Sequence, residues 1–168
     1  LLEHSHNPYI LGNALAQTIS EDSFLITEIP IFERNLAQLD YSIIWEEHLT
    51  YFTQKTFESF ISSLGLQIVW SKVFSYGYED CLVAFIKRKP HKIESSPPCH
   101  LQSSENYLEF FSSSFTEMKK KVCTTLDRFK RDQKKVALYG SGHGGHTFLN
   151  LFGVHSFFEF VIDDNPVK

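Results

Sequence analysis

The feature that most constrains the fold of this chain is a break at residues 90–104. This stretch contains Pro97-Pro98 together with several Ser and His residues, a composition that interrupts helices and strands. We therefore interpret it as a linker between a first region, residues 1–89, and a second region, residues 105–168. At 168 residues the chain is long enough for one domain or two small ones, and its 16 Phe favour a substantial core.

The first region has the pattern of an α/β sheet that ends in a hairpin. Apolar residues spaced as on one face of a helix precede a short β-rich run that Pro30 closes. Thr53 can cap a second helix, and Gly65 can end it. The order predicts the closing half of a sheet whose last two strands pair with each other. The expected elements are a helix over 7–19, a strand over 24–29, a helix over 53–64, and strands over 66–74 and 82–87.

A long amphipathic helix is expected to open the second region, because apolar residues recur there at spacings of three and four. The basic run Lys119–Lys121 falls on the opposite face, and we interpret it as a solvated surface rather than a nucleic-acid site. The apolar positions are Leu108, Phe111, Phe115, Met118, Val122, Leu126 and Phe129.

A second, Rossmann-like α/β unit is expected after this helix. It consists of a strand over 136–139, a turn over 140–145, a helix over 146–152 and a strand over 158–162. Two strands and one helix cannot bury both faces of a sheet. Either more sequence therefore follows in the native protein, or this unit packs on the first.

The turn of this unit carries the spacing Gly-x-Gly-x-x-Gly in Gly140, Gly142 and Gly145, with an acidic residue about 20 positions later. Glycines in such a turn let the backbone approach a phosphate at a helix N-terminus. The same spacing also suits a plain tight turn between a strand and a helix, and both interpretations stay open. His143 and His146 crowd the loop, and a redox NAD site is the weaker interpretation.

The segment from Leu39 to Phe52 crowds carboxylates, an imidazole and aromatic rings together without a clean helical or strand period. A packed scaffold gains little from such a segment, since buried charges and polar ring tips need partners. A site that moves protons gains more, because a carboxylate such as Glu47 can orient His48 and raise its basicity. His4, just ahead of the first helix, is a second histidine expected near the same edge of the sheet.

Composition excludes several classes of function. The net charge of -4 and the pI near 6.1 give no basic face for nucleic acid. No apolar run approaches the ~20 residues that span a bilayer, and we see no cleavable signal pattern. Cys81, Cys99 and Cys123 have neither disulfide nor zinc spacing. We therefore expect a cytoplasmic protein without a metal site, a membrane segment or a nucleic-acid partner.

Four segments of the first region resemble the back half of class I S-adenosylmethionine-dependent C-methyltransferases of deoxysugar biosynthesis. Val136 to Lys168 is similar to the C-terminal Rossmann-like domain that accompanies that catalytic domain. The resemblance is weak only between about His91 and Glu105. The segments of the first region are Leu1-Leu2-Glu3-His4, Ile26-Thr27-Glu28-Ile29-Pro30, Leu39 to Phe52, and Gly77-Tyr78-Glu79-Asp80.

The resemblance implies a reaction on a nucleotide-linked 4-keto-6-deoxyhexose. In that family a base removes the proton beside the ketone, and the resulting enolate carbon takes the methyl group of S-adenosylmethionine. By resemblance His48 is the base, Glu47 orients it or the sugar, and His4 belongs to the same pocket, since the interval from His4 to His48 fits the family's spacing. The substrate-binding residues expected on the same basis are Trp45, Tyr51, Tyr78 and Glu79.

Two departures from the family limit what is expected of these residues alone. Trp45 stands where the family can carry a tyrosine, and an indole donates a hydrogen bond but cannot titrate. The zinc-binding segment and the main cofactor loop of the family are expected ahead of Leu1. We therefore expect a fragment of a methyltransferase that is inactive by itself. The alternatives are a non-catalytic nucleotide-binding or interaction module that keeps the fold, and a methyltransferase-fold enzyme with another substrate. The sequence does not give the oligomeric state.

Overall fold

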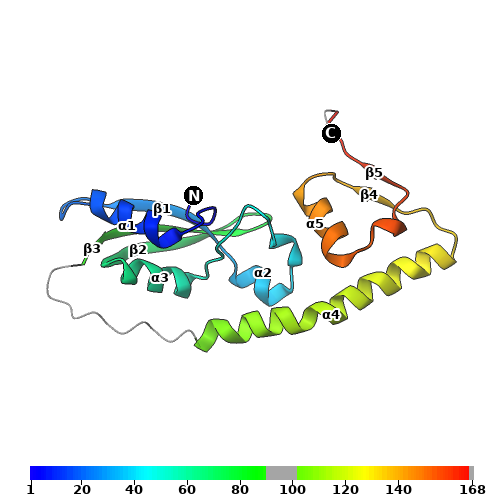
Figure 1. Ribbon diagram of the computed structural model, residues 1–168, viewed down its shortest axis with the longest axis horizontal. Helices are drawn as coiled ribbons and strands as arrows, with labels where there is room; N and C mark the ends of the chain where they lie inside the picture. The colour runs from blue at the N-terminus through cyan, green and yellow to red at the C-terminus, as the bar shows by residue number, and fades with distance from the viewer. Residues whose placement is uncertain (90–101, 167–168) are drawn as a thin grey trace. The chain divides into compact units, whose positions relative to one another are not determined.

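A computed structural model describes residues 1–89 and 102–166 (Figure 1), and its two compact units are described separately below. The first unit is formed by Leu1–Gln38 with Glu46–Leu108, and the second by Leu39–Trp45 with Glu109–Lys168. The expected linker falls largely outside the described residues. The predicted domain boundaries stay predictions. The division into units assigns Leu39–Trp45 to the second unit, which the sequence did not predict.

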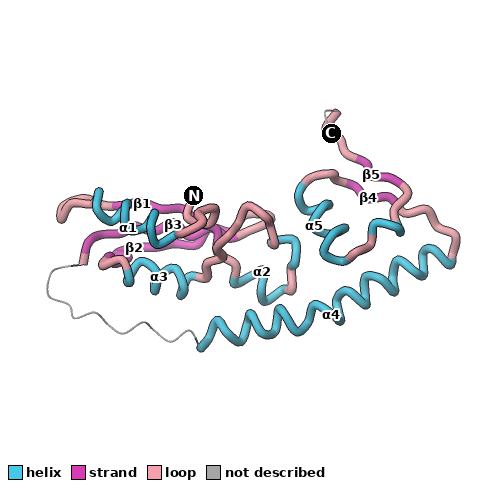
Figure 2. The backbone as a smooth tube through the Cα atoms, viewed as in Figure 1, coloured by secondary structure: helices cyan, strands magenta, loops and turns pink. Residues whose placement is uncertain are grey.

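The first unit contains a three-stranded sheet in the order β1-β3-β2 (magenta in Figure 2). Its strands are β1 (Leu25–Ile31), β2 (Leu66–Ser75) and β3 (Asp80–Arg88). Both β1 and β2 run antiparallel to β3, so the predicted hairpin of β2 and β3 is confirmed. The prediction ended the first strand before Pro30, whereas Pro30 pairs with Cys81 inside β1. Proline lacks the N–H of a ladder and is tolerated at the edge of a sheet, where β1 lies.

Helices α1 (Pro8–Thr18) and α3 (Gln54–Ser63) form where the apolar spacing and the Thr53 cap predict them. The Asn7 side chain accepts hydrogen bonds from the first turn of α1, and Thr53 does the same for α3. Thr56 completes a capping box, because its hydroxyl accepts from the backbone N–H of Thr53 at 2.8 Å. A short helix, α2 (Glu33–Gln38), was not predicted.

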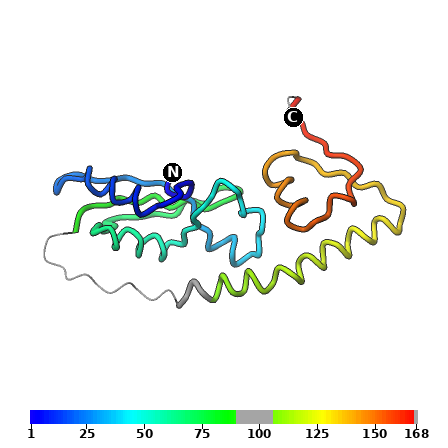
Figure 3. Tube along the Cα trace, in the orientation of Figure 1, coloured from blue at the N-terminus to red at the C-terminus, as the bar shows by residue number. Residues whose placement is uncertain are grey.

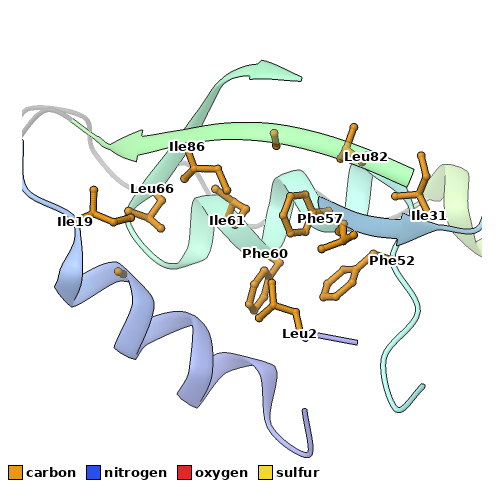
Figure 4. Close-up of a cluster of buried hydrophobic side chains, with 13 residues drawn as sticks. Leu2, Ile19, Ile31, Phe52, Phe57, Phe60, Ile61, Leu66, Leu82 and Ile86 are labelled. Atoms are coloured by element: carbon orange, nitrogen blue, oxygen red, sulfur yellow. The ribbon is translucent and has the colours of Figure 1, made fainter. Parts of the chain in front are cut away.

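The core of the first unit lies between one face of the sheet and the helices α1 and α3 (Figure 4). Phe57, Leu82 and Ile86 are fully buried there, and each such side chain contributes about 1.5–3 kcal/mol through burial. Leu2, Phe52 and Phe60 point toward one another in the same cluster, which ties the N-terminal segment to α3. The residues that precede α1 are thus part of the packed fold.

The second unit contains the part of α4 (Gln102–Arg131) from Glu109 on, together with β4 (Ala137–Tyr139), α5 (His143–Phe152) and β5 (Phe160–Ile162), which Figure 3 follows from green-yellow to red. The strands β4 and β5 are parallel, as a strand–helix–strand unit requires. The predicted second helix began at His146, but α5 begins three residues earlier, after Gly142 as its N-cap. Gly153 ends it in the left-handed conformation.

The apolar face of α4 packs as predicted from Phe111 to Phe129. Leu108 differs, since 56% of it is exposed. Tyr41 and Phe152 are buried in the same core, so the segment Leu39–Trp45 supplies part of it. Tyr41 begins a single 3-10 turn, Tyr41–Ile43. Across residues 1–89 and 102–166, no helix is both long and apolar enough to cross a membrane.

Candidate functional site

The first unit brings His4 and His48 together. Their ring centroids are 4.8 Å apart, with the rings inclined at 68°. The carbonyl oxygen of Glu3 accepts hydrogen bonds from the backbone N–H groups of Leu49 (2.7 Å) and Thr50 (3.1 Å). These bonds fasten the N-terminal segment to the segment after His48, and backbone geometry therefore sets the distance between the imidazoles.

Two aromatic rings lie near His48, that of Phe32 directly after β1 and that of Tyr51 in the segment after His48. The Phe32 ring lies 6.2 Å from the His48 ring and 4.8 Å from that of Tyr51, and Phe32 is only 2% exposed. The backbone N–H of Phe32 donates to the carbonyl of Phe52 at 3.0 Å, so the loop is fixed to the end of the strand. The predicted placement of His48 beyond the carboxyl end of this strand agrees with this arrangement.

Glu47 contributes to the pair through its backbone. The Nδ1–H of His4 donates to the Glu47 carbonyl oxygen at 2.9 Å. A carbonyl only accepts, so Nδ1 carries the proton and Nε2 is the basic nitrogen of neutral His4. The Glu47 side chain is exposed. Its predicted role in orienting His48 or a sugar stays a prediction.

Glu3 adds a buried carboxylate that sequence reasoning did not assign. The residue is 8% exposed, and its Oε1 lies 3.6 Å from Nε2 of His4. In the sequence, the position of Glu3 directly before His4 could have indicated this role. Sequence reasoning also missed Phe32, whose position directly after Pro30-Ile31 could have indicated that it lies near the site.

Tyr78 and Glu79 lie in the turn between β2 and β3. The side chain of Asn35 donates to the Tyr78 carbonyl at 3.2 Å, and the backbone N–H of Tyr76 donates to the Glu79 carbonyl at 2.9 Å. Arg34 also donates to the Tyr76 carbonyl (3.1 Å), which fixes α2 to this turn. The Tyr78 side chain points to solvent at 93% exposure. Substrate contact by these two residues stays a prediction.

Trp45 lies in the second unit, whereas Glu46–His48 lie in the first. Its ring contacts that of His143, the first residue of α5, with centroids 5.2 Å apart. Thr147 and His143 also form a hydrogen bond, with 3.1 Å between the Thr147 hydroxyl oxygen and Nε2 of His143. The sequence cluster around His48 is thus divided at Trp45, and the ring expected to bind substrate packs beside the glycine loop.

The glycine loop is built tightly. Gly140 has φ +100°, a conformation that favours glycine, and a Cβ on Gly145 would lie 2.3 Å from the Gly140 carbonyl oxygen. Asp163 accepts hydrogen bonds from the backbone N–H and the hydroxyl of Ser141, both at 2.7 Å. These contacts explain Gly140 and Gly145 as packing requirements. Gly142 serves as the N-cap of α5, and phosphate binding by the loop stays a prediction.

Comparison with known families gives a match over part of the chain. Residues 91–168 match the model of the C-methyltransferase C-terminal domain. The match supports a C-methyltransferase. It includes Glu109–Lys168 of the second unit. No curated protein matches the chain.

Proposed function

We propose that the chain is part of an S-adenosylmethionine-dependent C-methyltransferase that acts on a nucleotide-linked 4-keto-6-deoxyhexose. The observation that carries the proposal is the pairing of His4 and His48 at 4.8 Å, in a chain whose residues 91–168 match a C-methyltransferase domain. The first unit then represents the end of a class I catalytic domain, and the second unit the start of a Rossmann-like one. A cytoplasmic location fits Cys81 and Cys123, which are free thiols.

His48 is the proposed base. It removes the proton from the carbon beside the ketone, and the electrons move onto the ketone oxygen as an enolate. Phe32 and Tyr51 shield one side of the imidazole with aromatic surface, which keeps bulk water from that side. His4, oriented by the Glu47 carbonyl, is placed to hydrogen-bond the substrate or the protonated His48.

S-adenosylmethionine supplies the electrophilic methyl group when bound. Its main binding loop is expected ahead of Leu1, and the residues described here do not form that cradle. What residues 1–89 contribute is the proton transfer and the orientation of the acceptor. Tyr51, Tyr78, Glu79 and Trp45 are proposed to contact the sugar nucleotide.

The test is an isotope-exchange assay on the complete protein that carries this chain. The keto-sugar nucleotide is incubated in D2O without S-adenosylmethionine, and deuterium at the carbon beside the ketone is followed by NMR. His48→Asn should slow the exchange at least 100-fold, as expected for loss of a general base. His6→Asn, the same change at an exposed histidine, should leave the exchange unchanged.

Methyl transfer from labelled S-adenosylmethionine is measured alongside the exchange. Exchange at the wild-type rate in His48→Asn would show that His48 is not the base. A complete protein that binds the nucleotide but neither exchanges the proton nor transfers methyl would instead support a non-catalytic binding module.

A further inference from the structure

We propose that Glu3, His4 and His48 form a binding site for a divalent transition metal of the zinc class. One ligand-type atom from each of the three side chains lies within 4.8 Å of the other two. Two imidazoles and one carboxylate are a ligand set that proteins use for Zn²⁺ and for non-haem Fe²⁺. The set comes from two segments that backbone hydrogen bonds from Leu49 and Thr50 to Glu3 hold together.

The contact of His4 with the backbone matches that of a metal-binding histidine. Metal-ligating imidazoles usually donate their second N–H to a carbonyl or carboxylate, which fixes the tautomer and the direction of the lone pair. Here Nδ1 of His4 donates to the Glu47 carbonyl at 2.9 Å. Nε2 is left as the ligand atom, and it faces Oε1 of Glu3 at 3.6 Å.

The burial of Glu3 favours a cation at this point. Its side chain is 10% exposed, and a carboxylate so far from water needs a positive charge near it. Oε1 of Glu3 faces the His4 imidazole. A divalent ion between this oxygen and the two rings would neutralise the carboxylate.

The three ligand atoms must move closer together to bind one ion. Ligand atoms around a tetrahedral ion with bonds of about 2.1 Å are roughly 3.4 Å apart, so separations of up to 4.8 Å must shorten by up to about 1.4 Å. His48 is half-buried and its loop contains no helix or strand, so we expect its ring to rotate toward the ion. Water or substrate oxygen would complete the coordination.

The metal and the proposed base compete for the same lone pair. This consequence rests on the proposed function: an imidazole of His48 bound to a metal cannot remove a proton from the sugar. Zinc is then an inhibitor of the exchange reaction, and acid, which protonates the imidazoles, releases it.

The test measures binding of Co²⁺ to the complete protein by visible absorption, without sugar nucleotide or S-adenosylmethionine. Nitrogen and oxygen ligands around tetrahedral Co²⁺ give d–d bands in the visible range, and Zn²⁺ should displace Co²⁺ and remove these bands. Glu3→Gln and His48→Asn should each weaken binding at least tenfold, in line with loss of one ligand. His6→Asn should bind as wild type, and comparison of variants removes the contribution of any other metal-binding part.

Equal Co²⁺ binding by wild type, Glu3→Gln and His48→Asn would overturn the site, as would the absence of this signal at millimolar Co²⁺. Circular dichroism confirms that each variant is folded. Because the readout needs no turnover, the metal site can fail while the exchange assay still supports His48 as the base. Conversely, Co²⁺ can bind through the three residues while that assay rejects the base.

Discussion

The ring of His4 meets the ring of His48 edge to face at 4.8 Å, although the two residues lie in segments separated by α1, β1 and α2. The contact depends on the residues around it. Leu2 is buried in the core, and the carbonyl oxygen of Glu3 accepts hydrogen bonds from the backbone directly after His48. The histidine pair is therefore a product of packing at the start of the chain.

Leu2→Ala should destabilise the first unit and separate the histidines. Leu2 is 5% exposed among large aromatic side chains, and a leucine-to-alanine change at such a position costs about 2–5 kcal/mol. Urea unfolding followed by circular dichroism measures the cost. Leu1→Ala is the matched control, because Leu1 is 75% exposed and should cost less than about 0.5 kcal/mol. Equal stability of the two variants would show that the N-terminal segment does not anchor His4.

Gly145→Ala should destabilise the second unit, whereas Gly144→Ala should not. A Cβ on Gly145 would lie 2.3 Å from the backbone oxygen of Gly140, so the turn between β4 and α5 has to move. A Cβ on Gly144 meets nothing within 4 Å, and alanine is the better helix former by about 1 kcal/mol. Thermal unfolding of the two variants should therefore shift in opposite directions. A higher melting temperature for Gly145→Ala would contradict the tight turn.

Tyr41→Phe should weaken the second unit by about 1 kcal/mol through loss of one buried hydrogen bond. The Tyr41 hydroxyl donates to the Phe111 carbonyl at 2.6 Å, and the residue is 5% exposed. Burial also raises the pKa of Tyr41, so its phenol should ionise late in an absorbance titration at alkaline pH. Tyr139→Phe, at a residue 71% exposed, is the control and should change neither quantity. Identical unfolding of both variants would mean that Leu39–Trp45 does not pack with α4.

The predictable part of the fold is the part with local signals. An apolar stripe marked the first helix, the cap at Thr53 marked the second, and the hairpin of β2 and β3 follows from two adjacent β-rich runs. The extension of β1 through Pro30 depends on pairing with β3, and a local sequence pattern carries no information about that pairing. The early start of α5 is similar, because a run with two glycines has low helix propensity and depends on the packing of the helix in the folded unit.

The candidate site was predicted by a different route. The lack of a regular period marked Leu39 to Phe52 as unusual, and the position of His4 ahead of the first helix together with the family resemblance joined His48 to His4. The division of that segment between Trp45 and Glu46 could not be predicted, because an irregular loop has no repeating pattern that shows which unit each residue belongs to. Glu3 was overlooked because a single carboxylate carries no pattern, and its burial is a property of the folded chain.

Cys81 should make the stability of the first unit fall at alkaline pH. Burial, with the negative charges of Glu79, Glu28 and Asp80, raises the pKa of the Cys81 thiol from 9.0 to about 11. The folded state therefore holds the neutral thiol where the unfolded chain already loses its proton. The stabilisation is fully present below pH 9.0 and is lost as the pH rises through about 11. Urea unfolding between pH 8 and 11 should show a steeper decline of the free energy of unfolding for wild type than for Cys81→Ala, since only the thiol adds this pH dependence.

Alkylation by iodoacetamide at pH 8, followed by mass spectrometry, should label Cys81 far more slowly in the folded protein than in denaturant. Rapid labelling of folded Cys81, with parallel pH profiles for the two proteins, would contradict a thiol held neutral by burial.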